Sequence, residues 1–194
     1  MKLHLGCGRD IKPGWTNLDI APGDGIDIVC DLDTEQIPLK DDSVSEFYGS
    51  HVVEHLNNPL GAFAELYRVA KPDAILNVAT PYGSSDDAWE DPTHKRPYYI
   101  GSWSAFGQPY HYRADYGYTA DWICTNITLQ LSDMLFGDPT ELVQDEVMAY
   151  VQTQRNVVVQ MLATLKAVKP ARPARRELFK PAELMFQVVH VQGL

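Results

Sequence analysis

The sequence predicts an α/β fold with a mostly parallel sheet. Short β-rich runs alternate with turns through the first half of the chain, and one well-marked helix lies between two of these runs. The first run ends in Gly6-Cys7-Gly8, and carboxylates follow the next two runs. These observations together predict a sheet that holds a ligand at the carboxyl ends of its strands.

Five strands are expected in the first half, because β-rich runs are separated there by clusters of Gly, Pro and Asp. Their expected bounds are Lys2–Leu5, Thr16–Ile20, Ile26–Cys30, Val44–Ser50 and Ala74–Thr80. A helix is predicted before the last of them, since Asn58 can cap it and Pro59 suits its first turn. Lys71-Pro72 ends this helix, because proline cannot continue its hydrogen-bond ladder.

Residues 81–121 are predicted to form mostly loop, since they are rich in Tyr, Trp, His, Gly, Pro and Asp and show little periodicity. A loop of this length within a compact domain is usually functional, and its aromatic content argues against simple disorder. We expect an aromatic-rich substrate loop here. Its candidate acceptor-pocket residues are Tyr82, Tyr98, Tyr99, Tyr110 and His111.

Further strands and one helix are expected in residues 122–194. The predicted elements are a strand at Trp122–Met134, a helix at Thr140–Thr153, a strand at Asn156–Val168 and a strand at Met185–Val191. Closely spaced valines favour the strand at Asn156–Val168, although neighbouring Met, Leu and Ala residues would also suit a helix. The proline-broken basic segment at residues 169–176 is interpreted as a solvated connection.

Length and composition suit one ordinary domain over residues 1–194, with 45% hydrophobic residues. The formal charge of −10 argues against nucleic acid as the main partner, because such binders present basic surfaces. The 3 cysteines lack any Cys-x-x-Cys spacing, which predicts neither disulfides nor a thiolate zinc site and suits a reducing cytoplasm. No signal-peptide core or membrane-length apolar run is evident, so we expect a cytoplasmic protein without a membrane partner.

The Gly6-Cys7-Gly8 loop and two following carboxylates predict a nucleotide-cofactor site. Glycine lets the backbone turn tightly and approach a ligand that a β-carbon would exclude. Asp19 suits ribose hydroxyls, because an ionised carboxylate only accepts hydrogen bonds, and Asp31 can accept from the amine of an adenine. Asp19 follows Gly8 after far fewer than the ~20 residues typical of dinucleotide-binding units. The usual intervening helix is therefore expected to be truncated or absent.

Several segments of residues 2–81 occur in an order that resembles a known family. They are residues 3–8, 13–19, 37–44, 50–56 and 65–72. This series resembles the class I methyltransferases that use S-adenosylmethionine, especially the compact bacterial branch with a Gly-Cys-Gly loop. The resemblance implies a Rossmann-like methyltransferase fold: a mostly parallel, seven-stranded sheet flanked by helices, here with a truncated first helix. S-adenosylmethionine would lie across the carboxyl ends of the first four strands, in agreement with the general rule for open α/β sheets.

The resemblance also assigns a part of the cofactor to each motif. The Gly-Cys-Gly loop would face the methionine part, the residues after the second strand the ribose, and those after the third strand the adenine. The residues after the fourth strand would border the methionine and the transferred methyl. The cofactor-binding residues implied in this way are Gly6, Cys7, Gly8, Asp19, Ile20, Asp31, Leu32, Ser50 and His51.

Methyl transfer from a sulfonium is an in-line displacement, so the protein has to bind, align and, where needed, deprotonate the acceptor. We expect a small-molecule or sugar acceptor and no metal. His94 is the candidate general base, because it lies in the aromatic loop beside Asp91 and histidine titrates near working pH. A structural hydrogen bond to the loop backbone is the alternative role for His94.

Two other functions remain open from the sequence. His51-Val52-Val53-Glu54-His55 also matches the signature of inverted zinc proteases, in which both histidines bind zinc from one helical face. The preceding glycine and acid motifs have no place in such a hydrolase. The chain could also be a non-catalytic module that keeps the nucleotide fold, although the intact Asp19 and Asp31 argue against that.

Overall fold

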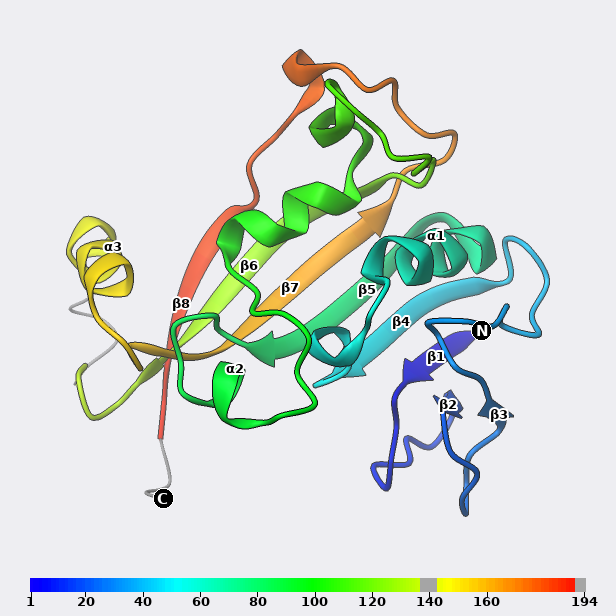
Figure 1. The fold of residues 1–194 in the computed structure, drawn as a ribbon, viewed down its shortest axis with the longest axis horizontal. Coiled ribbons are helices and arrows are strands. Elements are labelled where there is room, and N and C mark those ends of the chain that lie inside the picture. The colour runs from blue at the N-terminus through cyan, green and yellow to red at the C-terminus, as the bar shows by residue number, and fades with distance from the viewer. Residues whose placement is uncertain (137–142, 191–194) are drawn as a thin grey trace.

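A computed structural model describes residues 1–136 and 143–190, and these form one eight-stranded sheet with helices packed against it (Figure 1). The strands are β1 (Lys2–Leu5), β2 (Thr16–Asp19), β3 (Ile28–Val29), β4 (Val44–Ser50), β5 (Ala70–Pro81), β6 (Trp122–Ser132), β7 (Val158–Ala167) and β8 (Glu183–Val189). Their order across the sheet is β3-β2-β1-β4-β5-β7-β6-β8. Only β7 runs antiparallel to its neighbours. The mostly parallel α/β prediction is therefore confirmed.

The number of strands differs from the seven that the resemblance implied. All eight were expected as separate runs, and β8 joins the sheet as an edge strand parallel to β6. The ambiguous segment after Asn156 forms strand β7, because it lies between β5 and β6 and buries Met161, Ala163 and Leu165. Two expected ends, at Thr140 and Val191, lie outside the described residues.

Helix α1 (Pro59–Val69) begins as predicted, since Oδ1 of Asn58 accepts a hydrogen bond from the backbone N–H of Gly61 at 3.1 Å. It ends at Val69, and strand β5 already begins at Ala70. The predicted start of β5 at Ala74 was therefore late, because Lys71-Pro72 lies within the strand instead of the helix. Helix α3 (Gln144–Thr153) accounts for the described part of the other predicted helix.

No helix lies between β1 and β2, so the first helix of the fold is absent from residues 6–15 instead of being shortened. Turns fill this segment, and three of its glycines, Gly6, Gly8 and Gly14, have positive φ. Left-handed backbone at such positions is incompatible with a continuous right-handed helix. The segment therefore forms a compact loop along the carboxyl edge of the sheet.

The aromatic segment at residues 81–121 contains short helices, namely α2 (Asp87–Glu90), η2 (Ile100–Phe106) and η3 (Gln108–His111). Much of its aromatic content packs the core. Phe106 stacks on Phe63 of α1 with ring centroids 3.6 Å apart, and the indole of Trp103 donates to the sulfur of Met161. Helices α1 and η2 thus lie over the same face of the sheet (Figure 1). This explains why the segment is ordered despite its lack of periodicity.

The basic connection after β7 is mostly exposed, as predicted for residues 169–176, but Arg172 ties it to the rest of the protein. Asp121 is fully buried, and its carboxylate accepts from Nε and Nη2 of Arg172 at 2.7 Å each and from the Arg172 backbone N–H at 2.9 Å. The backbone N–H of Gln108 also donates to Asp121 at 3.0 Å. One carboxylate therefore joins the connection to η3 and to the start of β6.

The sheet face opposite α1 and η2 carries polar pairs between neighbouring strands. Thr164 donates to Asn77 at 2.9 Å, and the amides of Gln130 and Gln187 lie 3.2 Å apart.

Within the described residues, no helix is both long and apolar enough to cross a membrane.

Candidate cofactor site

The Gly6-Cys7-Gly8 loop turns away from β1 with a backbone that requires glycine. Gly6 has a φ of +54°, and a β-carbon added to it would lie 2.4 Å from Cγ2 of Val52. Gly8 has a φ of +51°, but a β-carbon there would meet no atom within 4 Å. The first glycine therefore permits close packing against the residue after β4, and the second faces open space.

Asp19 at the end of β2 is held beside this loop. Its Oδ2 accepts a hydrogen bond from the backbone N–H of Gly8 at 2.7 Å, and its Oδ1 accepts from Ala21 at 3.1 Å. A carboxylate oxygen has more than one lone pair, so both oxygens keep acceptor capacity for a ligand. The loop and the acid of the sequence motif therefore form one structural unit.

A cavity of about 260 Å³ lies at the carboxyl ends of β1, β2 and β4. The residues that line it are Gly6, Leu18, Asp19, Ile20, Cys30, Asp31, Leu32, Asp33, His51, Val52, His55 and Leu56. An adjoining hollow beyond Asp19 is bordered by Gly8, Arg9 and Asp24. Below, the first of these is called the cofactor pocket.

Most of the cofactor residues expected from the sequence meet in this pocket. Those that line it are Gly6, Asp19, Ile20, Asp31, Leu32 and His51. Gly8 borders the adjoining hollow instead. Cys7 and Ser50 line neither, and the Cys7 side chain is 3% exposed, with burial raising the pKa of its thiol. The sulfur of Cys7 therefore packs toward the core.

Asp33 is a pocket residue that the sequence reasoning missed. Its carboxylate accepts from the backbone and side-chain nitrogens of Asn57 at 3.0 Å and from the backbone of Asn58 at 2.8 Å. Burial raises the pKa of Asp33, but these hydrogen bonds outweigh burial, so its pKa lies below the ordinary value. Asp33 thereby fixes the turn that leads into α1. Because Asp33 lies two residues after Asp31, its position in the sequence could have identified it as a pocket residue.

The other missed residues are neighbours of predicted ones or lie just beyond β4. They are Leu18, Cys30, Val52, His55 and Leu56. Leu18 and Cys30 adjoin the strand-end acids, whereas His55 belongs to the short helix η1 (Val53–His55). The rule that ligands bind beyond strand ends could have identified the first two.

His51 lies at a strained corner after β4. Its φ is +55°, which is unfavourable for a side chain with a β-carbon, and its backbone N–H donates to Ala79 at 2.9 Å. The ring contacts two side chains: Nδ1 is 3.3 Å from Oε1 of Glu54, and Nε2 is 2.9 Å from Nε2 of Gln160. Glu54 is the main cause of a raised His51 pKa. The left-handed backbone thus places the His51 side chain in the lining of the cofactor pocket.

The same corner argues against the zinc-protease alternative. That arrangement requires one helix through His51 and His55, with both rings on one face. Here His51 has left-handed backbone, and only Val53–His55 form a 3₁₀ turn. The helix on which this alternative depends is not formed.

His94 lies behind His55 as seen from the cofactor pocket. The two rings pack edge to face with centroids 4.7 Å apart, and Nδ1 of His94 is 3.3 Å from the carbonyl oxygen of Ala88. His94 lines a small hollow of about 60 Å³ with Trp89 and Asp91. It is therefore close to the cofactor pocket without bordering it.

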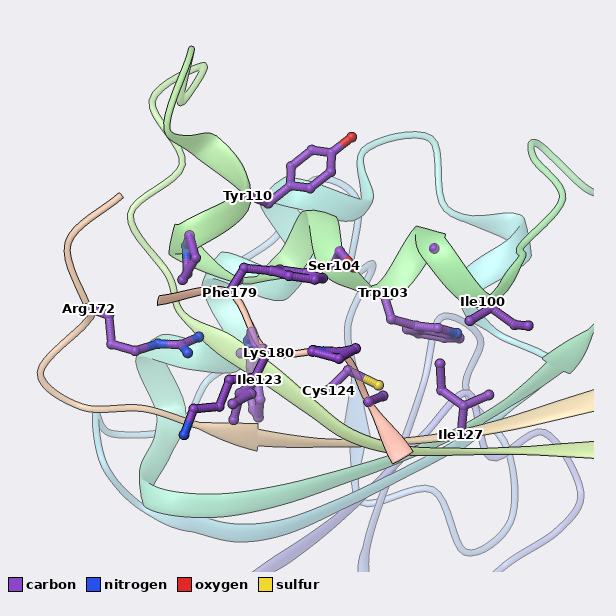
Figure 2. Close-up of a pocket in the computed structure, with 16 residues that line it drawn as sticks. Ile100, Trp103, Ser104, Tyr110, Ile123, Cys124, Ile127, Arg172, Phe179 and Lys180 are labelled. Carbon is purple, nitrogen blue, oxygen red and sulfur yellow. The ribbon is translucent and has the colours of Figure 1, made fainter. Parts of the chain in front are cut away.

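A second cavity, of about 190 Å³, lies between η2, η3 and the start of β6 (Figure 2). Tyr110, Phe179 and Ile123 line it, together with Arg172, whose guanidinium is paired with Asp121. Because β6 runs parallel to β5, its start lies at the sheet edge opposite the cofactor pocket. Tyr110, a candidate acceptor-pocket residue, is therefore remote from the cofactor pocket. His111, another candidate acceptor-pocket residue, forms a hydrogen bond from Nε2 to the carbonyl oxygen of Ala105 at 2.8 Å.

Comparison with known proteins agrees with this geometry. Residues 3–78 match the family described as Methyltransferase domain. Over 109 residues the chain is 31% identical to the malonyl-[acyl-carrier protein] O-methyltransferase of Serratia marcescens, an alignment that spans 45% of this chain and 42% of that protein. The chain thus matches less than half the length of this curated relative.

Solved structures share the fold at low sequence identity. A methyltransferase of Archaeoglobus fulgidus described as SAM-dependent aligns with a TM-score of 0.57 and 16% identity over 85% of each chain. The YcgJ protein of Bacillus subtilis aligns with a TM-score of 0.54 and 12% identity over 88% of this chain and 92% of that one. The chain therefore shares the fold of these solved structures, and its residues 3–78 match the methyltransferase domain family.

Proposed function

We propose that the protein is an S-adenosylmethionine-dependent methyltransferase that acts on a small-molecule or sugar acceptor by in-line methyl transfer. The observation that carries the proposal is the cofactor pocket, where the Gly6 turn meets the two strand-end acids Asp19 and Asp31. The match of residues 3–78 to the methyltransferase domain family and the shared fold support it independently.

The residues present suit this cofactor. The open space at Gly8 and the free acceptor capacity of Asp19 favour the ribose hydroxyls beside the glycine loop. Asp31 lines the pocket, and its carboxylate is held by the backbone N–H of Asp33 at 2.9 Å and the hydroxyl of Thr34 at 2.8 Å, while each oxygen keeps acceptor capacity for an adenine amine. The methionine end would then lie toward Gly6 and His51. S-adenosylmethionine would supply the transferred methyl group as an electrophilic carbon on a positively charged sulfur.

The chain's own contribution would be to align the acceptor with that carbon and to exclude competing water. His51 borders the pocket directly, whereas His94 borders the neighbouring hollow. This placement supports a role for His94 on the acceptor side instead of the cofactor side. His94 as general base remains a prediction.

The acceptor proposal rests on the net charge of the chain. A chain with a net charge of −10 is poorly suited to polyanionic acceptors such as nucleic acid. The Serratia marcescens relative is described as acting on malonyl-[acyl-carrier protein]. A carboxylate is therefore one acceptor group to test here, beside sugar hydroxyls and phenols.

Isothermal titration calorimetry with S-adenosylmethionine and with its demethylated product tests the cofactor assignment. We expect one molecule bound per chain. A folded sample that binds neither compound would contradict the proposal. Transfer of a radiolabelled methyl group should then be measured against sugars, phenols, small carboxylates and malonyl-[acyl-carrier protein]. Binding without transfer to any of them would favour the non-catalytic alternative.

A further inference from the structure

Three potential metal ligands converge beside the cofactor pocket. One ligand atom from each of Glu54, His55 and His94 lies within 4.8 Å of the other two. The first two belong to η1, and the third comes from the loop after α2. The backbone N–H of Lys95 donates to the carbonyl oxygen of Glu54 at 2.7 Å, which pins the two segments together directly beside the ligands.

The hydrogen bonds of both histidines leave the same ring nitrogen free. The hydroxyl of Thr93 donates its proton to Asp91 at 2.6 Å, so the 2.9 Å contact with Nδ1 of His55 requires that Nδ1 carry the hydrogen. Nδ1 of His94 faces a carbonyl oxygen, which can only accept. Each neutral ring therefore keeps its lone pair on Nε2, and Nε2 of His94 also lies 3.9 Å from Oδ2 of Asp91. Acceptors that bond the other ring nitrogen in this way orient metal-binding histidines in proteins.

The burial of Glu54 is a second, independent observation that points to a cation site. Its side chain is 2% exposed, yet neither carboxylate oxygen accepts a hydrogen bond from any described residue. His51 is near, with Nδ1 3.3 Å from Oε1. A buried carboxylate whose one charged neighbour is the half-exposed ring of His51 is incompletely compensated, and a bound divalent ion would complete its coordination.

The donor set selects the kind of ion. Two imidazoles and one carboxylate suit first-row transition ions such as Zn²⁺, whereas Mg²⁺ and Ca²⁺ prefer oxygen ligands only. Tetrahedral zinc holds its ligand atoms about 3.3 Å apart, so the three groups would move slightly inward. Three protein ligands leave at least one coordination position open.

We infer that Glu54, His55 and His94 form a binding site for a divalent transition-metal ion, with its open position directed to an oxygen of the methyl acceptor. The second part rests on the proposed function, because His55 lines the cofactor pocket and His94 lines the adjacent hollow. Lys95 and Arg96 border that hollow and would favour an acceptor with an anionic or strongly polar oxygen. This assignment replaces the expectation that no metal is bound.

In that arrangement the metal would lower the pKa of an acceptor hydroxyl, whose proton leaves to solvent. A lone pair of the resulting oxyanion forms the new bond to the methyl carbon. The bond from that carbon to sulfur breaks, and its electron pair stays on sulfur, which becomes an uncharged thioether. His94 would then hold the ion instead of taking the proton.

The test is a titration of the chelator-treated full chain with Co²⁺, followed by visible absorption, and with Zn²⁺, followed by calorimetry. We expect one ion per chain and an absorption spectrum of four- or five-coordinate Co²⁺. Glu54→Gln, His55→Gln and His94→Gln should each weaken binding at least about 100-fold. His190→Gln, which removes an exposed histidine at the end of β8, should leave binding unchanged.

Two further readouts separate metal binding from a structural role and from the proposed function. Metal-free Glu54→Gln should have a melting temperature equal to or above that of the metal-free wild type, while losing the increase that Zn²⁺ produces in the wild type. Acetohydroxamate, a simple oxygen ligand, should change the Co²⁺ spectrum if a position is open. Unaltered affinity in the three variants would overturn the site, and an unchanged spectrum would overturn its contact with the acceptor. Failure to bind S-adenosylmethionine would contradict the proposed function alone.

Discussion

The backbone N–H of Gly8 donates a 2.7 Å hydrogen bond to Oδ2 of Asp19, which joins the glycine loop after β1 to the acid after β2. This contact aligns the carboxylate at the boundary between the cofactor pocket and the hollow beyond it. The relationship explains how a loop without a helix can still present the acid that we propose binds the ribose.

Asp19→Asn should weaken S-adenosylmethionine binding by about 10-fold to 100-fold, because a charge-assisted hydrogen bond contributes roughly 1.5–3 kcal/mol. Calorimetry with the cofactor measures the effect. Glu183→Gln removes the same charge from an exposed site on edge strand β8 and should bind like the wild type. Equal affinity in the two variants would contradict the ribose assignment.

Gly6→Ala should destabilise the protein by about 1–3 kcal/mol and impair cofactor binding, since the new β-carbon would lie 2.4 Å from Val52 and φ is +54°. Urea unfolding followed by circular dichroism gives the loss. Gly101→Ala is the matched control, because a β-carbon there meets no atom within 4 Å. The double variant Gly6→Ala/Val52→Ala should regain part of the lost free energy of unfolding. If it regains none, the contact with Val52 does not cause the destabilisation of Gly6→Ala.

Removing Arg172 should cost about 3–5 kcal/mol, because the fully buried Asp121 carboxylate loses its charged partner, whereas removing Asp121 should cost less, because the Arg172 side chain is 20% exposed. Asp121→Asn and Arg172→Met can be compared by urea unfolding. Lys166→Met, which breaks an exposed ion pair with Asp73, should change stability by less than about 1 kcal/mol. The double variant should lose less than the sum of the single variants. Strict additivity would indicate that the two side chains do not interact.

Asp33→Asn should lower stability most at neutral pH. Because hydrogen bonds depress the folded-state pKa of Asp33, the carboxylate stabilises the fold above its unfolded pKa of about 3.9, and this contribution disappears as pH falls through the lower folded value. The free energies of unfolding of wild type and variant should therefore converge as pH is lowered from about 7 to below about 3. If the difference between the two free energies of unfolding stays constant over this pH range, ionisation of Asp33 does not contribute to stability.

Local pattern was sufficient for most strands and for the start of α1. The run at Val44–Ser50 has the predicted bounds, and Asn58 caps α1 through a contact with Gly61 only three residues away. Such features depend on near neighbours in the chain, which the sequence displays directly. The segment at Val158–Ala167 was ambiguous for the opposite reason, since its strand form depends on pairing with β5 and β6.

The aromatic segment shows a similar limit. Trp103 and Phe106 could not be distinguished from acceptor-pocket residues by composition, and their burial against Met161 and Phe63 assigns them to the core. Cys7 is a related case at the site itself, because its position in the glycine motif did not reveal that its side chain points inward.

The sequence by itself determined the α/β class, the strand runs and the glycine and acid motif, because each of these features depends on residues that lie close together along the chain. Only the tertiary structure decided the tie between Asp121 and Arg172 and the meeting of Glu54 and His55 with His94. These outcomes depend on sheet order and loop path. Both arise from the burial of apolar surface across the whole chain, which no local pattern specifies.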